Sequence, residues 1–320
     1  MSSRSLDLEM RIRRRRILAG AVAAACSTLL PATLSGQSNS TRLILLGTGG
    51  GPRPRRTRSA PAQVVIVDGS AYVVDCGDGV ARQLVLAGVP LSSLRHVFVT
   101  HQHSDHNADY GNLLLLAWTA GLRTRVDTWG PPPLRKMTDL FFEMNEYDIA
   151  TRIADEGRVP LKPLVEVHEI TDGGPLLENA DVRVTAAVVD HPPVVPAFAF
   201  RFDASDRSIV ISGDTRASPS LIALARGAAV LVHEAYFDEA AVDRLVAGVG
   251  NAERLKESVL SHHTSAADAG RVAREAGVRT LVLSHFVPTE DAAITDEMWV
   301  RAARTHFDGE VVMGKDLLEL

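Results

Sequence analysis

The feature that most constrains this chain is a dense group of potential metal ligands directly after the predicted strand 96–99. They are His101, His103, Asp105 and His106. In an extended chain, the direction of the side chains repeats every two residues, so His101 and His103 point the same way. The remaining two ligands can face a second cation where the chain turns into a helix. Burying four such polar groups together without partners would be costly, so the fold must build a polar site here.

The chemistry of these side chains indicates a pair of metal ions. Imidazole and carboxylate groups suit zinc, and two metals about 3.5–4 Å apart can share one hydroxide. We therefore predict a dinuclear zinc site, with manganese or iron as the alternative metals. A zinc-bound water with a pKa near 7 would provide a nucleophile at neutral pH.

The rest of the chain alternates short apolar strands with amphipathic helices. Strands are predicted at 42–46, 63–67, 71–74, 96–99, 164–170, 182–189, 197–202, 208–211, 230–232 and 280–283. Helices are predicted at 79–87, 111–120, 133–144, 218–225, 239–247, 265–276 and 296–305. This pattern is typical of a layered α/β fold, and we expect a single domain over residues 37–320. Segment 128–163 contains three consecutive prolines and is either an insertion or lid, or part of the core.

The group at 101–106 has the pattern His-x-His-x-Asp-His and resembles the signature of the metallo-β-lactamase superfamily. Further similar motifs follow the family's order at 45–50, 74–79, 212–215, 232–235, 263–266 and 283–286. The resemblance runs from about residue 42 to the C-terminus and is most specific for the ribonuclease Z and arylsulfatase-like branch. It implies a four-layer αβ/βα sandwich with the metals at one edge.

The resemblance also implies roles for individual residues. His101, His103 and His191 would hold the first zinc ion, Asp105, His106 and His285 the second, and Asp214 would bridge both. A histidine matching His263 would donate a proton to the leaving group, and Glu234 would orient it. Asp105 would help to position the nucleophile. We prefer His263 to its neighbour His262 for this role.

Other residues receive weaker assignments. Cys76 is predicted to be structural, and His96, His168 and His306 lack ligand spacing. The basic segment 53–58 either receives an anionic group of the substrate or is a solvated run of charge.

Residues 1–36 read as a signal peptide. Arginines at 13–16 precede an apolar, alanine-rich run, which favours a twin-arginine signal and an exported, periplasmic or extracellular protein. The alternatives are an uncleaved membrane anchor or lipid attachment at Cys26. After cleavage we expect no stable membrane insertion, and the single remaining thiol cannot form an internal disulfide.

The substrate prediction rests on the net charge of the protein and on its predicted export. The chain carries a net charge of −5, and without its first 36 residues the balance falls to −9, which opposes general binding to a polyanion. We therefore expect no nucleic-acid partner and predict hydrolysis of a small anionic ester, an aryl sulfate or phosphodiester. The alternatives are a ribonuclease Z-like RNA phosphodiesterase, a lactone or β-lactam hydrolase and, from a different class, a non-catalytic metal-binding protein. The sequence leaves open whether the protein forms a homodimer.

Overall fold

The structure, a computed structural model, describes residues 40–320, which are built around two β-sheets. The first sheet has the order β1-β2-β3-β4-β5-β6 and the second β13-β12-β11-β10-β9-β8-β7, so strands that follow one another in sequence are neighbours. The first sheet contains β1 (Arg42–Gly47), β2 (Ala62–Val67), β3 (Ser70–Val74), β4 (Leu94–Phe98), β5 (Val126–Gly130) and β6 (Val165–Glu169). The second contains β7 (Gly174–Glu178), β8 (Val182–Val189), β9 (Ala197–Ala204), β10 (Ser208–Ile211), β11 (Val230–Tyr236), β12 (Thr280–Val287) and β13 (Glu310–Met313).

Each sheet begins with antiparallel strands and continues with parallel ones. β1, β2 and β3 pair antiparallel, whereas β3 to β6 pair parallel. In the second sheet β7 to β10 pair antiparallel and β10 to β13 parallel. Parallel strands need crossover connections, which explains why the helices alternate with strands in these parts of the chain.

Both faces of each sheet are covered, and the alternation of side chains along a strand shows how. In β1, Leu43 and Leu45 face the second sheet and pack in one core with Phe198 and Phe200. Ile44, the residue between the two leucines, belongs to a separate core beneath the helices. A strand that is apolar on both faces therefore needs two covering layers.

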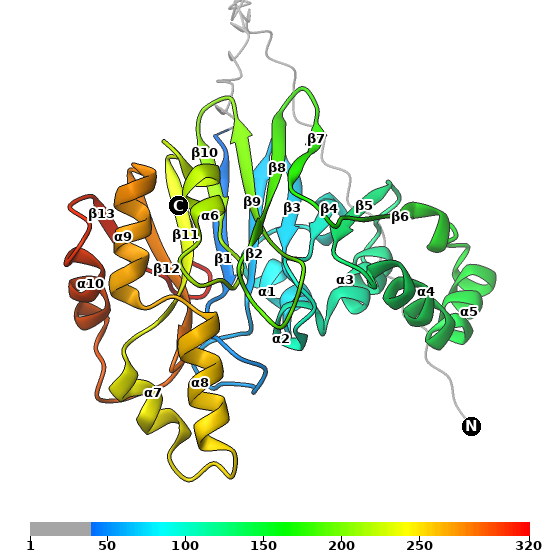
Figure 1. Ribbon diagram of the computed structural model, residues 1–320. Helices are drawn as coiled ribbons and strands as arrows, with labels where there is room; N and C mark the ends of the chain where they lie inside the picture. Colours follow the sequence, from blue (N-terminus) through cyan, green and yellow to red (C-terminus); the bar gives the residue numbers. More distant parts are fainter. Residues whose placement is uncertain (1–39) are drawn as a thin grey trace, which may run out of the picture. The chain divides into compact units, whose positions relative to one another are not determined.

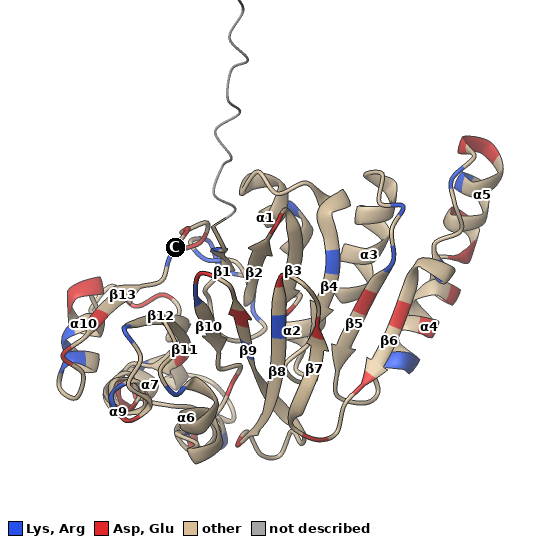
Figure 2. Ribbon diagram, turned by 90° about the horizontal axis from the view of Figure 1, so that it is seen from above, with Lys and Arg blue, Asp and Glu red and all other residues tan. Residues whose placement is uncertain are grey.

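Helices supply the outer layers (Figure 1). The helices are α1 (Val80–Leu86), α2 (Ser104–Asn107), α3 (Tyr110–Thr119), α4 (Leu134–Met144), α5 (Glu146–Glu156), α6 (Pro219–Ala225), α7 (Glu239–Val246), α8 (Ala252–His262), α9 (Ala266–Ala276) and α10 (Asp296–Arg304). α1 and α3 cover the first sheet, and α6, α9 and α10 cover the second. The helices α5 and α10 carry charges of both signs toward solvent (Figure 2). The predicted four-layer αβ/βα sandwich is confirmed.

Several elements were missed in the sequence because their patterns are weak. β7 contains Gly174 and Pro175, which are rare in strands, and β13 has only four residues. The helices α5 and α8 are rich in charged residues and bury little. Tertiary pairing rather than local propensity places these segments.

Segment 128–163 belongs partly to the core. It contains the end of β5 and the helices α4 and α5, and Phe142 packs with Trp118 and Leu161 in a small separate cluster. Met144 and Tyr147, by contrast, are 73% and 87% exposed. Core packing therefore explains one face of this segment, and the segment does not line the cavity described below.

The predicted signal peptide at 1–36, including Cys26, lies outside the described residues, so the export prediction stays a prediction. Among residues 40–320, none of the helices has both the length and the apolar character required to span a bilayer.

Candidate metal centre

The predicted ligands come from both sheets and meet at the same edge of the sandwich. His101 and His103 follow β4, and the short helix α2 carries Asp105 and His106. The three further ligands come from the second sheet. His191 follows β8, Asp214 follows β10, and His285 lies within β12.

The first group consists of three histidines and a carboxylate whose ligand atoms lie within 4.8 Å of one another. His101 Nε2 and His103 Nδ1 are 2.9 Å apart, and His191 Nε2 lies 3.2 Å from His103 Nδ1. Asp214 Oδ2 lies 3.8 Å from His101 Nε2. This set of three nitrogens and one oxygen is what zinc prefers.

The second group shares Asp214 with the first. His106 Nε2 lies 3.3 Å from Asp214 Oδ1 and 3.6 Å from Asp105 Oδ2. His285 Nε2 lies 3.3 Å from Asp214 Oδ2 and 3.4 Å from Asp105 Oδ2. The structure thus brings all seven predicted ligands together, with one carboxylate between two sets.

The chemistry of these atoms fits a pair of metal ions. His106 Nε2 and Asp214 Oδ1 are buried and have no hydrogen-bond partner, although such groups are costly to bury unpaired. Burial opposes the charge of Asp214, but the imidazoles of His106 and His285 hold the pKa of this carboxyl well below its usual range. An ionised carboxylate among histidine nitrogens is the donor set of a cation site.

A second layer of contacts fixes the ligands, and the sequence analysis did not assign it. Asp75 Oδ2 accepts a hydrogen bond from His106 Nδ1 at 2.7 Å, and Asp75 Oδ1 accepts one from the Thr100 backbone N–H at 2.8 Å. His191 Nδ1 donates to the His262 carbonyl at 3.0 Å. In both cases the proton sits on Nδ1, which leaves Nε2 free to bind a metal. A carboxylate at the end of the buried strand β3 was the signal that could have revealed Asp75.

His285 reaches the site through a local irregularity of β12. The pairing register with β11 shifts at this point, so that His285 is the extra residue of a β-bulge. Its φ of 47° is in the left-handed region that few non-glycine residues adopt. Bulges re-aim side chains next to functional sites. A Cβ on Gly50 would lie 2.9 Å from His285 Nδ1, so the neighbouring loop can approach only as glycine.

The predicted proton donor stands beside the second group. His263 Nδ1 lies 3.0 Å from Glu234 Oε1 and 3.8 Å from Asp214 Oδ2. Burial disfavours the charged ring, but the Glu234 carboxylate outweighs it and raises the pKa of His263 to about 9. The ring of His262 instead contacts Ser258 and is not among the lining residues of the cavity.

These groups open into a cavity of about 490 Å³. One wall is the loop with Arg53 and Arg55, and the other is apolar, with Leu245, Leu255 and Val259 from the hairpin of α7 and α8. The cavity therefore combines positive charge and apolar surface next to the ligand groups.

Comparisons with known proteins identify the family. Residues 53–286 match the beta-lactamase superfamily domain. Ribonuclease Z from Mycobacterium marinum is 35% identical over 278 residues, which cover 86% of this chain and 96% of that protein. The short form of human tRNase Z has a TM-score of 0.64 at 23% identity and covers 87% of this chain and 98% of its own. Zn²⁺-bound PqqB from Methylobacterium extorquens has a TM-score of 0.60 at 14% identity, with 87% and 99% covered.

These similarities correct two predictions. The prediction of a hydrolase of small anionic esters, such as aryl sulfates, is wrong, because the relatives over most of the chain are named ribonuclease Z. The expectation of no nucleic-acid partner is wrong for the same reason, since net charge does not report how arginines gather locally. The coarser prediction, a hydrolase of the metallo-β-lactamase fold with candidate metal-binding groups, is confirmed. The chain belongs to the beta-lactamase superfamily and, within it, to the ribonuclease Z family.

Proposed function

We propose that this protein is a metal-dependent RNA phosphodiesterase of the ribonuclease Z type that holds two zinc ions. The observation that carries the proposal is the position of Asp214, which is shared between two ligand groups in a chain related to ribonuclease Z over most of its length. His106 Nε2 and Asp214 Oδ1 are buried without a hydrogen bond, and a bound metal ion would satisfy both atoms, which supports the same conclusion.

The residues of the metal centre would have distinct roles. His101, His103 and His191 would hold one ion, Asp105, His106 and His285 the other, and Asp214 would contact both. Bound zinc would make water nucleophilic at neutral pH and would offset the negative charge of a phosphodiester. Asp105 is held in place by the Gly51 backbone N–H, which donates to its Oδ2 at 3.0 Å.

His263 has the position of a general acid. Glu234 engages its Nδ1, so the other ring nitrogen is the one that can deliver a proton to the departing oxygen. Glu234 is itself fixed, because its Oε1 accepts hydrogen bonds from the backbone N–H groups of Thr215 and Thr264. Glu234 is therefore a positioning residue, and His263 is the catalytic residue.

The test is cleavage of RNA by the purified, zinc-loaded protein. We expect cleavage of a precursor tRNA with a 3′ extension and of bis-nitrophenyl phosphate, and no turnover of nitrophenyl sulfate or nitrocefin. A fully metallated protein that leaves RNA intact but hydrolyses nitrophenyl sulfate would overturn the proposal.

A substitution separates the roles within the site. His263→Ala should slow RNA cleavage by about 10²–10⁴-fold and affect bis-nitrophenyl phosphate much less, because nitrophenolate leaves without a proton. His306→Ala, which changes an exposed histidine just after the end of α10, is the matched control and should leave both rates unchanged. An equal loss on both substrates would remove His263 as the proton donor.

A further inference from the structure

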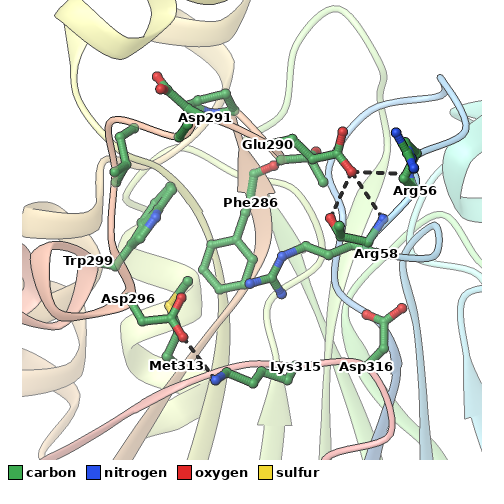
Figure 3. A pocket seen from close by; sticks show the side chains of 15 residues that line it. Arg56, Arg58, Phe286, Glu290, Asp291, Asp296, Trp299, Met313, Lys315 and Asp316 are labelled. Carbon is green, nitrogen blue, oxygen red and sulfur yellow. Dashed lines mark hydrogen bonds and ion pairs between the residues drawn. The ribbon is translucent and has the colours of Figure 1, made fainter.

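Three cavities surround the loop of residues 50–58. In the largest of them, about 790 Å³, most of the charged side chains of the lining already have partners within the protein (Figure 3). Lys315 pairs with Asp296 at 3.0 Å, and Glu290 accepts a hydrogen bond from the backbone N–H of Thr57 at 3.0 Å. Arg58 donates to neighbouring oxygens and lies over an aromatic ring, 4.3 Å from its centroid. This cavity shares no lining residue with the metal centre cavity.

A second cavity, of about 410 Å³, has a different charge balance. It is lined by Arg53, Arg55 and Arg58 from the loop and by Arg82 from α1, and its only carboxylate is that of Asp78. Arg58 is engaged as described above. In the part of the chain that the structure describes, no ion pair joins the other three arginines to a carboxylate.

Among these three arginines, Arg55 has a polar group that no hydrogen bond satisfies. Arg55 Nε is buried and has no hydrogen-bond partner. Burial, together with the nearby charge of Arg53, lowers the pKa of Arg55. By contrast, Arg42, Arg152 and Arg216 each pair with a carboxylate at 2.9 Å or less. An anion that enters this cavity would satisfy groups that the protein leaves without partners.

The arginine cavity adjoins the metal-centre cavity. Gly51, Pro52, Arg53 and Arg55 line both cavities, so a single loop forms the wall between them. A ligand that places one anionic group at the metal centre and another among these arginines would be complementary to both cavities. A nucleic-acid strand has this property, because its phosphates repeat at a short, regular spacing.

Building on the proposed function, we propose that Arg53, Arg55 and Arg82 form a phosphate subsite that binds a phosphodiester next to the one being cleaved in the RNA strand. The planar guanidinium group can donate two parallel hydrogen bonds to a phosphate, which a lysine cannot do. The subsite also explains how a protein of net negative charge can bind RNA, because the positive charge is concentrated at the surface that the RNA strand contacts.

Kinetics on two substrates tests the subsite. Arg82→Gln and Arg55→Gln should each raise KM for a single-stranded RNA by about threefold to tenfold, with a smaller change in kcat. The effect on bis-nitrophenyl phosphate should be smaller, because that molecule has one phosphodiester only. Each substitution should also reduce the slope of log kcat/KM against log salt for RNA by about 0.7. Arg56→Gln is the matched control: it belongs to the same loop but lines the largest cavity, and it should change neither quantity.

A second measurement does not need RNA cleavage. Adenosine 3′,5′-bisphosphate should inhibit bis-nitrophenyl phosphate hydrolysis, and Arg82→Gln should raise its inhibition constant more than that of adenosine 5′-monophosphate. Equal effects of Arg82→Gln on RNA and on bis-nitrophenyl phosphate, or none on either, would overturn the subsite. If the wild-type protein leaves RNA intact while the selective change in bisphosphate inhibition is still seen, only the proposed function fails. If that change is also missing, both fail.

Discussion

The replacement of Asp75 by asparagine tests how the metal centre is supported. The two oxygens of Asp75 only accept hydrogen bonds: Oδ1 accepts one from the Thr100 backbone N–H at 2.8 Å and Oδ2 one from His106 Nδ1 at 2.7 Å. The Thr100 hydroxyl lies 3.0 and 2.9 Å from Oδ1 and Oδ2. Asparagine has the same shape but one NH₂ group in place of an oxygen. If that NH₂ faces His106, the imidazole must move its proton to Nε2, which lies among the metal-site carboxylates. If it faces Thr100, two donors meet.

The magnitude follows from this conflict. Substitutions of residues that orient metal ligands weaken metal binding by about 10–100-fold, which corresponds to about 1.4–2.7 kcal/mol. Backbone strain does not contribute, because Asp75 has a φ of 62° and asparagine tolerates this region well. We therefore expect Asp75→Asn to fold and to bind zinc about 10–100-fold more weakly than the wild type.

The assay is zinc binding in competition with a chromophoric chelator, combined with circular dichroism to verify the fold. Asp127→Asn is a matched control, because Asp127 accepts a similar 2.7 Å hydrogen bond from His168 away from the metal centre. It should change zinc affinity less than twofold and stability by less than about 1 kcal/mol. A folded Asp75→Asn protein with wild-type zinc affinity would refute the tautomer argument.

Three further outcomes are expected. Removing the metal with a chelator should lower Tm by roughly 5–10 °C at metal concentrations about 100-fold above Kd, and added zinc should restore it; an unchanged Tm would contradict the metal centre. Phe200→Ala, which empties a fully buried position between the sheets, should reduce the free energy of unfolding by about 3–5 kcal/mol in urea titrations, whereas Val195→Ala, at a position 74% exposed, should change it by less than about 0.5 kcal/mol. Burial lowers the pKa of His96 to about 4, below the ordinary 6.5, so the unfolded chain binds the extra proton and stability falls as pH drops from about 6.5 toward 4. His96→Phe, which preserves the stacking on Tyr72, should remove about 1–2 kcal/mol of this acid sensitivity, as judged from unfolding at pH 7 and pH 5; an unaltered pH dependence would show that His96 is not its source.

Local sequence patterns predicted much of the architecture. The predicted bounds of β8 and β10 match the structure, because both strands are apolar runs flanked by clear breaks. The residues of the ligand-rich loop 101–106 also divide between the two groups of ligand atoms as predicted, because they are close together in the chain. The substrate prediction failed because it used the net charge of the whole body, which does not reveal that Arg53, Arg55 and Arg82 line one cavity.

The sequence by itself determined most of the elements, the ligand-rich loop and, through its motifs, the family. Only the tertiary structure decided the distances between groups far apart in the chain, because those depend on how two sheets pack. Asp75 meets His106 across 31 positions, and His285 enters the site through a bulge that no local pattern marks. The proposed phosphate subsite likewise forms only after folding, when the loop and the helix α1 bring their arginines to the same cavity.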